Sequence, residues 1–126
     1  MASILIIDDD CSPTLDLLEL LREEGHDVVC ATSLVDALPH LRHDELDLVM
    51  IDISFSEETG MRILEALCEE PRYAGLNIAV YSESADEETI KHALHLGACG
   101  FIDKRLQWET LYDRIREHLP TESQPA

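Results

Sequence analysis

Five short runs of apolar, β-prone residues recur along the chain, and the stretches between them carry apolar residues at helical spacing. The runs show little polar alternation, which is typical of strands covered on both faces, as in a parallel sheet. Consecutive parallel strands are joined by right-handed crossovers, and helices supply them here. The sequence therefore predicts an α/β fold with a doubly wound parallel sheet, its strands at residues 3–7, 28–31, 48–51, 78–81 and 99–102.

The intervening stretches predict five helices with local start and stop signals. We expect the first helix to begin with Ser12 as its N-cap and Pro13 at its first position, and to end at Gly25. Pro39 removes a backbone donor inside the second helix, so we expect that helix to be short or kinked. The other signals are an apolar face of Leu15, Leu17, Leu18 and Leu21 in the first helix, Gly60 and Pro71 around the third, Glu87, Glu88 and Gly97 in the fourth, and Leu111, Ile115 and Leu119 in the last.

The length and composition indicate one globular domain over residues 1–119, followed by a polar flexible tail or linker stub at residues 120–126. The 27 acidic against 9 basic residues give a net charge of -18, which would repel nucleic acid and an anionic membrane surface. No run approaches the roughly 20 apolar residues of a membrane span. No signal peptide is visible, so we expect a cytoplasmic protein. We expect the four scattered cysteines to be reduced, mostly buried thiols: Cys11, Cys30, Cys68 and Cys99.

Polar residues follow four of the five predicted strands. Doubly wound sheets bind ligands at the carboxyl ends of their strands, so these side chains are expected to converge on one edge. Adjacent aspartates repel one another unless solvent or a cation compensates them. Carboxylates suit a hard divalent ion such as Mg²⁺, and a lysine and a hydroxyl suit the oxygens of a phosphoryl group. The converging set is Asp8, Asp9, Asp10, Asp52, Ser82, Asp103 and Lys104.

With these residues the chain resembles a receiver domain of two-component response regulators, similar to the single-domain chemotaxis regulator. The resemblance covers residues 3–119. It implies a flavodoxin-like fold in which a five-stranded sheet of order 2-1-3-4-5 is flanked by five helices. The motifs that carry it are IIDDD, VMIDIS with Asp52, Gly60 eight residues later, AVYSES with Ser82, and GFIDK with Phe101 and Lys104.

The resemblance also implies a chemistry. Asp52 would be the phosphoacceptor, a carboxylate that attacks the phosphorus of a phosphohistidine and becomes an acyl phosphate. Asp10 is expected to lie outside the pocket, with capping of the first helix as its alternative role. The implied cofactor is Mg²⁺, held by Asp8, Asp9, Asp52 and the backbone carbonyl of Ser54.

Three further residues would complete the switch. Lys104 would pair first with the phosphoacceptor and then with a phosphoryl oxygen, while the Ser82 hydroxyl would donate to another oxygen. Phe101 matches the aromatic residue that turns inward once the hydroxyl has moved. Phosphorylation would thus repack the surface formed by the fourth helix, the fifth strand and the fifth helix.

The chain departs from the family pattern in three places. Arg105 stands where a proline usually follows the lysine, so the loop that carries the lysine is expected to differ. Ser56 replaces a proline often found after the phosphoacceptor. Glu83 stands where a small residue usually admits the donor, so Glu83 and the neighbouring Ser84 would modulate access. The alternative for Glu83 is a side chain turned to solvent.

The resemblance describes a signalling switch that catalyses only its own phosphorylation and dephosphorylation. Its implied partners are a histidine kinase or phosphotransfer protein and a downstream target or output domain, and it leaves a homodimer open. Two other functions also stay open. One is a receiver-like interaction module that switches without phosphate, favoured by Glu83 and the missing prolines. The other is a phosphatase of the haloacid dehalogenase type built on Asp8, Asp10 and Ser12, which gives Asp52 no role.

Overall fold

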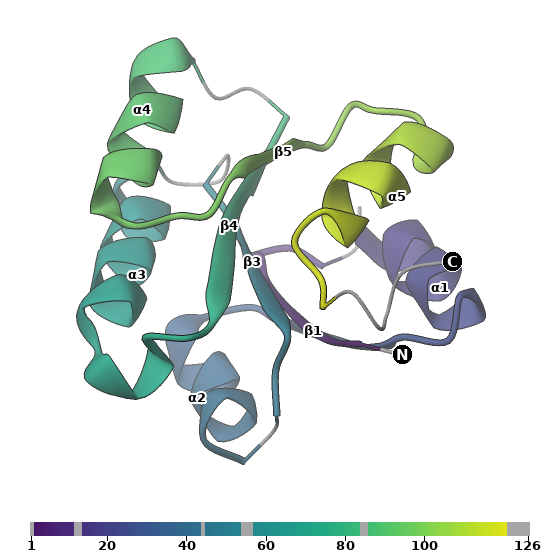
Figure 1. Cartoon of the computed structure of the whole chain (residues 1–126), viewed down its shortest axis with the longest axis horizontal. Coiled ribbons are helices and arrows are strands. Elements are labelled where there is room, and N and C mark those ends of the chain that lie inside the picture. The colour runs from purple at the N-terminus through teal and green to yellow at the C-terminus, as the bar shows by residue number, and fades with distance from the viewer. Residues whose placement is uncertain (1, 12–13, 44, 54–56, 84–85, 121–126) are drawn as a thin grey trace.

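Five parallel strands form a single sheet in the computed structural model of the chain, which describes residues 2–11, 14–43, 45–53, 57–83 and 86–120 (Figure 1). The strand order is β2-β1-β3-β4-β5, so the predicted flavodoxin-like topology is confirmed. The fifth strand is shorter than predicted: residues 99–100 bond to β4 through their backbone, but the strand itself begins at Phe101. The strands are β1 (Ser3–Ile7), β2 (Asp27–Ala31), β3 (Leu48–Asp52), β4 (Asn77–Ser82) and β5 (Phe101–Asp103).

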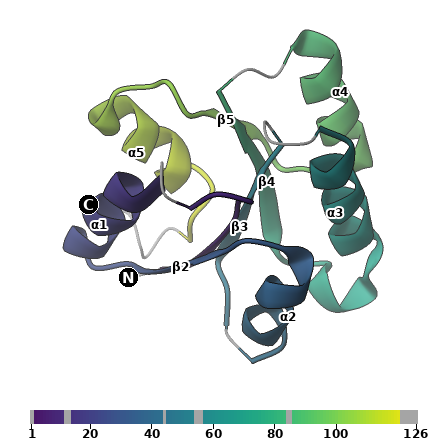
Figure 2. The ribbon, with the colours of Figure 1, turned by 180° about the vertical axis from the view of Figure 1, so that it is seen from behind.

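Helices cover both faces of the sheet, as Figures 1 and 2 show from opposite sides. One face carries α1 (Leu15–Glu23) and α5 (Trp108–Arg116), and the other carries α2 (Leu34–His43), α3 (Glu57–Glu69) and α4 (Glu87–Leu96). A short 3-10 helix, η2 (Pro71–Tyr73), follows α3. Within the described part of the chain, none of the helices is both long and apolar enough to cross a membrane.

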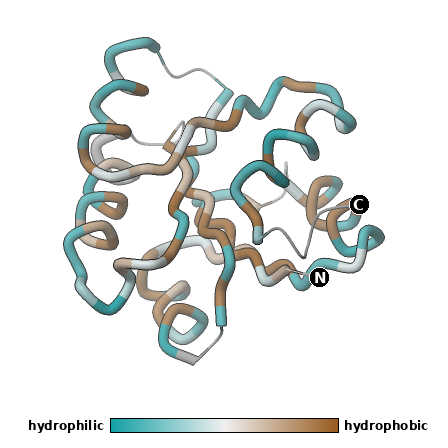
Figure 3. Tube along the Cα trace, in the orientation of Figure 1, coloured by the Kyte–Doolittle hydropathy of each residue, from teal (hydrophilic) through white to brown (hydrophobic). Residues whose placement is uncertain are grey.

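Each face of the sheet has its own apolar core. In β1, Ile4 and Ile6 pack with residues of α1 and α5, whereas Leu5 and Ile7 pack with residues of α2 and α3. All five residues of β3 are buried. In Figure 3, hydrophobic colour runs along the strands, and hydrophilic colour marks the outer turns of the helices. The near-continuous apolar runs of the sequence follow from this double coverage.

The first helix begins two residues later than predicted. Thr14 holds its N-cap position, and the predicted cap Ser12 and first residue Pro13 lie outside the described residues. The Thr14 side chain makes no cap hydrogen bond and donates to Asp8 instead. Leu15 is 54% exposed, so its predicted place on the apolar face is wrong. The rest of that face is buried: Leu17, Leu18 and Leu21.

Two other helices bear on the sequence predictions. α2 contains Pro39 yet runs for ten residues, one more than α1, so it is not short, and a kink at Pro39 stays a prediction. α4 begins after Asp86, whose carboxylate accepts a hydrogen bond from the backbone N–H of Thr89 at 2.8 Å. It ends at Gly97, whose φ of 123° favours glycine, as the sequence predicted.

The prediction of four reduced cysteines is wrong for one pair. Cys11 and Cys30 form a disulfide with their Cα atoms 6.3 Å apart, although 19 positions separate them in sequence. The sheet order explains the pairing, because β2 lies beside β1 and their carboxyl ends meet at the same edge. Cys68 and Cys99 are free thiols, the first half-buried and the second exposed, so the expectation of burial fails for Cys99.

Candidate functional site

Four strands deliver polar residues to the carboxyl edge of the sheet. β1 runs into Asp8, β3 ends at Asp52 and β4 ends at Ser82, and all three residues are buried, with at most 2% of their surface exposed. β5 is followed directly by Lys104. Strand register places these positions at one level, because Asp52 pairs with Tyr81 and Ser82 pairs with Asp103 in the parallel ladders. The predicted convergence is therefore present.

Lys104 joins two carboxylates at the centre of this edge. Its Nζ lies 2.6 Å from Oδ2 of Asp52 and 3.1 Å from Oδ2 of Asp8. The lysine side chain is 14% exposed and each carboxylate side chain 3%, so bulk water screens the three charges only weakly. The same Nζ lies 4.7 Å from the centre of the Tyr81 ring, which adds a cation–π contact.

The loop after β5 fixes the backbone of Lys104. Its N–H donates to the carbonyl of Ser82 at 2.9 Å, which ties the residue to the end of β4. Arg105 turns back on Asp103, with its Nε and Nη2 donating to the two carboxylate oxygens at 3.1 and 3.0 Å. Arg105, the residue after Lys104, is thus paired with Asp103, the last residue of β5. No cis peptide bond occurs among the described residues.

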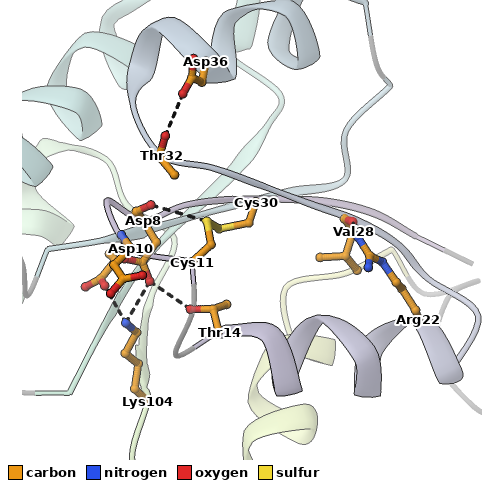
Figure 4. Close-up of a disulfide and its surroundings, with 11 residues drawn as sticks. Asp8, Asp10, Cys11, Thr14, Arg22, Val28, Cys30, Thr32, Asp36 and Lys104 are labelled. Atoms are coloured by element: carbon orange, nitrogen blue, oxygen red, sulfur yellow. Dashed lines mark hydrogen bonds and ion pairs between the residues drawn. A yellow bond between two sulfur atoms is a disulfide. The ribbon is translucent and has the colours of Figure 1, made fainter.

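Asp8 is held by neighbours on both sides. The Thr14 hydroxyl donates to its Oδ2 at 3.0 Å, and the backbone N–H of Asp10 donates to its Oδ1 at 3.1 Å. Its own N–H donates to the carbonyl of Ala31 at 2.9 Å, which anchors the residue to the end of β2. Figure 4 shows Asp8 between Thr14 and Lys104, close to the disulfide.

The electrostatics of the site favour an ionised Lys104 and make the Asp8 carboxyl group harder to ionise. Burial raises the pKa of Asp8, and the charge of Asp52 raises it further, against the lowering effect of the Asp10 N–H and of Lys104. Burial by itself would lower the pKa of Lys104, but its hydrogen bonds and charge contacts with Asp52 and Asp8 raise it overall. Burial also raises the pKa of Tyr81 to about 12, so this ring stays a neutral phenol.

The other predicted site residues lie around this centre. Asp9 and Asp10 are exposed on the loop after β1. Glu83 is exposed, in agreement with the interpretation of a side chain turned to solvent. Phe101 is half-buried and packs against the core under α2, α3 and α4. Three predicted residues lie outside the described ranges: Ser54, Ser56 and Ser84.

The donor set fits a hard divalent cation in its chemistry. Asp8 and Asp52 offer buried carboxylate oxygens but share one ammonium, so the pair keeps an excess negative charge, and Asp9 adds another carboxylate on the same edge. Oxygen ligands of this kind are those that Mg²⁺ prefers. In the ranges that the structure describes, no three acidic, histidine or cysteine side chains are already gathered as a metal site.

Sequence reasoning missed three contributors to the site. Thr14 carries no recognisable motif, because its role depends on the path of the loop that returns it to Asp8. Tyr81 precedes Ser82 in the strand motif, and only the sheet register places its ring under Lys104. The disulfide did have a signal: in a sheet of order 2-1-3-4-5, cysteines near the carboxyl ends of the first two strands become neighbours.

The family model for the response regulator receiver domain matches residues 4–116 of this chain.

Solved receiver structures share the whole fold. The chemotaxis response regulator CheY4 of Vibrio cholerae superposes with a TM-score of 0.82 at 24% identity, covering 94% of this chain and 99% of that one. The signal receiver domain of a DNA-binding response regulator from Colwellia psychrerythraea gives 0.80 at 24% identity, over 93% and 97%. A CheY-like receiver domain protein from Methanospirillum hungatei gives 0.79 at 25% identity, over 93% and 92%. At such identities the likeness establishes the fold, and residue roles must be argued from the site.

Proposed function

Because the chain belongs to the family of response regulator receiver domains, we propose that it accepts a phosphoryl group on Asp52 in a Mg²⁺-dependent reaction. The donor is a histidine kinase or a phosphotransfer protein. The observation that carries the proposal is the ion pair between the buried Asp52 carboxylate and Lys104, which also contacts Asp8. A lysine in this position can pair with the acceptor carboxylate before transfer and with an oxygen of the phosphoryl group after transfer.

Asp52 acts as the nucleophile. One of its carboxylate oxygens forms a bond to phosphorus while the bond from phosphorus to the donor histidine nitrogen breaks, and the histidine leaves with that electron pair. Lys104 then follows the negative charge from the carboxylate to a phosphoryl oxygen, and the Ser82 hydroxyl donates to a second one. Both groups sit at the ends of adjacent strands, which preorganises them for this step.

Asp8, Asp9, Asp52 and the carbonyl of Ser54 would hold Mg²⁺ at this edge. When bound, the ion supplies positive charge that lets a dianionic phosphoryl group approach a cluster of carboxylates. Binding of this ion would explain why Asp8 and Asp9 are adjacent acidic residues. Asp10 acts on the site through its backbone N–H, which donates to Asp8.

Phosphorylation would change the surface formed by α4, β5 and α5, which a downstream partner would recognise. Movement of Ser82 toward the phosphoryl group would let Phe101 turn inward, which repacks this surface for a downstream target or output domain. We propose residues 1–119 as the receiver unit, with residues 120–126 as a tail or linker, in a cytoplasmic protein. The net charge of -18 disfavours direct contact of this unit with nucleic acid or an anionic membrane.

Mg²⁺-dependent labelling by acetyl phosphate, read by intact mass, tests the proposal. The wild type should gain one phosphoryl group, Asp52→Asn none, and the exposed control Asp16→Asn as much as the wild type. A chelator should abolish labelling. Labelling that survives in Asp52→Asn would place the phosphate elsewhere, and no labelling in any of the three would favour the interaction module that switches without phosphate.

Glu83 and Ser84 are proposed to modulate access of the donor. Glu83 is exposed beside the end of β4 and adds negative charge where a dianion must approach. Glu83→Gln should therefore speed labelling by acetyl phosphate severalfold, and the gain should shrink in high salt. An unchanged rate would leave Glu83 as a solvated side chain without a role.

A further inference from the structure

The Cys11–Cys30 disulfide lies beside the acidic edge of the sheet. Cys11 is three residues after Asp8, on the loop that also carries Asp9 and Asp10, and Cys30 is the penultimate residue of β2. Figure 4 shows the two sulfur atoms next to Asp8 and Asp10, on the side of the sheet that α1 covers. The bond thus ties the loop of the site to a neighbouring strand.

We propose that this disulfide is a redox-modification site that sets the affinity of the acidic edge for Mg²⁺. The oxidised form holds the loop after β1 in the arrangement that binds the ion, and reduction releases the loop and weakens binding. The inference rests on the proposed function, because it concerns the cation site of that function.

The hydrogen bonds around Asp8 show how the bond would act. Besides its link to β2 through Ala31, Asp8 is oriented by Thr14 and Asp10, and both of these belong to the segment that Cys11 fixes. The Thr14 N–H donates to the carbonyl of Cys11 at 3.0 Å, so the position of Cys11 sets that of Thr14. A covalent tether at Cys11 therefore holds Asp8 from two directions, which lowers the entropy lost when a cation binds.

The disulfide is open to exchange. Cys11 and Cys30 are both only half-buried residues, so we expect a thiolate to reach the pair. In a reducing compartment, persistent structural disulfides are rare, and those that form are usually transient, catalytic or redox-sensing. Cys68 and Cys99 are both free thiols, so the oxidised form has its disulfide between Cys11 and Cys30.

The chemistry is a thiol–disulfide exchange with a dithiol reductant. One thiolate of the reductant attacks a sulfur of the pair and forms a mixed disulfide, and its second thiolate then displaces the protein sulfur. The protein S–S bond breaks, an S–S bond forms in the reductant, and two electrons and two protons reach Cys11 and Cys30. Oxidation by a disulfide of the same class reverses each step.

Mg²⁺ titration by calorimetry on the oxidised and the reduced wild type tests the proposal, with the redox state checked by thiol alkylation and mass. Reduction should increase the Kd for Mg²⁺ by about threefold or more. Amide hydrogen exchange at Asp8, Asp10 and Thr14 should become faster in the reduced form, and this second readout does not depend on phosphorylation.

Cysteine variants separate the pair from general effects of the reductant. Cys11→Ser and Cys30→Ser should each bind Mg²⁺ as the reduced wild type does, whatever the reductant present. The double variant Cys68→Ser with Cys99→Ser should keep the full redox response. Circular dichroism on each variant confirms that it is folded before affinities are compared.

The outcomes distinguish this inference from the proposed function. Equal Mg²⁺ affinity in both redox states, tighter binding after reduction, or four alkylatable thiols after mild oxidation would overturn the redox inference and leave phosphorylation of Asp52 untouched. Absence of Mg²⁺ binding in both states would overturn both, and the acetyl phosphate experiment would then fail as well.

Discussion

Replacing Lys104 by methionine tests most directly whether its charge compensates the two buried carboxylates. Lys104 is the ammonium that lies between the Asp8 and Asp52 carboxylates, and methionine keeps most of the side-chain length while removing the charge. In the absence of a divalent cation, the variant must either bury two facing carboxylates without compensation or take up a proton. Removing one partner of a buried charge network typically costs about 3–5 kcal/mol.

Protonation of one carboxylate sets a ceiling on this cost. Raising a carboxyl pKa from about 3.9 to neutral pH requires about 4 kcal/mol, since one pKa unit corresponds to about 1.36 kcal/mol. We therefore expect Lys104→Met to lower the free energy of unfolding by about 3 kcal/mol at about pH 7. The raised carboxyl pKa in the folded variant means that the deficit shrinks as the pH falls, to about 1.5 kcal/mol or less at about pH 5.

Urea unfolding followed by circular dichroism in a chelating buffer measures both values. Lys91→Met is the matched control, because Lys91 pairs with Glu87 at 3.2 Å while the two side chains are 73% and 83% exposed. It removes the same charge and should cost less than about 0.5 kcal/mol. Millimolar Mg²⁺ should restore more stability to Lys104→Met than to the wild type. A loss no greater than that of Lys91→Met, or one that is equal at both pH values, would refute the reasoning.

Three further outcomes follow from the disulfide, a buried histidine and a close-packed glycine. Reducing the disulfide should lower the free energy of unfolding by about 3 kcal/mol, because its ends are 19 positions apart in sequence, and urea titrations with and without a reductant measure the loss. Burial, followed by the positive N-terminus, lowers the pKa of His26 from its ordinary value of 6.5, and its Nε2 lies 2.7 Å from the Tyr112 hydroxyl. The unfolded chain therefore binds the proton more readily, so stability should fall as the pH drops below about 6.5, and His26→Gln should flatten that slope in urea titrations across pH. Finally, a Cβ on Gly60 would lie 2.9 Å from Cα of Ile53, whereas one on Gly75 meets nothing within 4 Å. Gly60→Ala should destabilise the protein by about 1–3 kcal/mol and Gly75→Ala should not, and equal thermal midpoints of the two variants would contradict this packing argument.

The pattern of the sequence predicted the framework of the site. Strands buried on both faces must be almost wholly apolar, so their ends are visible where polar residues begin, and parallel order brings those ends to one edge. For this reason the sequence alone indicates Asp8, Asp52, Ser82 and Lys104 as residues of this edge. The capping signals were less reliable: α1 has Thr14 at its N-cap in place of the predicted Ser12, and the Thr14 hydroxyl donates to Asp8 and not to its own helix.

The sequence by itself determined the parallel sheet and the identity of the residues at its carboxyl edge, because these depend on periodicity and on short motifs. The strand order came from the resemblance to a family. Only the tertiary structure decided which oxygen Lys104 approaches and that Thr14 supports Asp8. The physical reason is distance along the chain: such contacts depend on the path of loops and the register of strands, and no local pattern encodes them. Side chains that are remote in sequence become partners once the hydrophobic cores on both faces fix the strands that carry them.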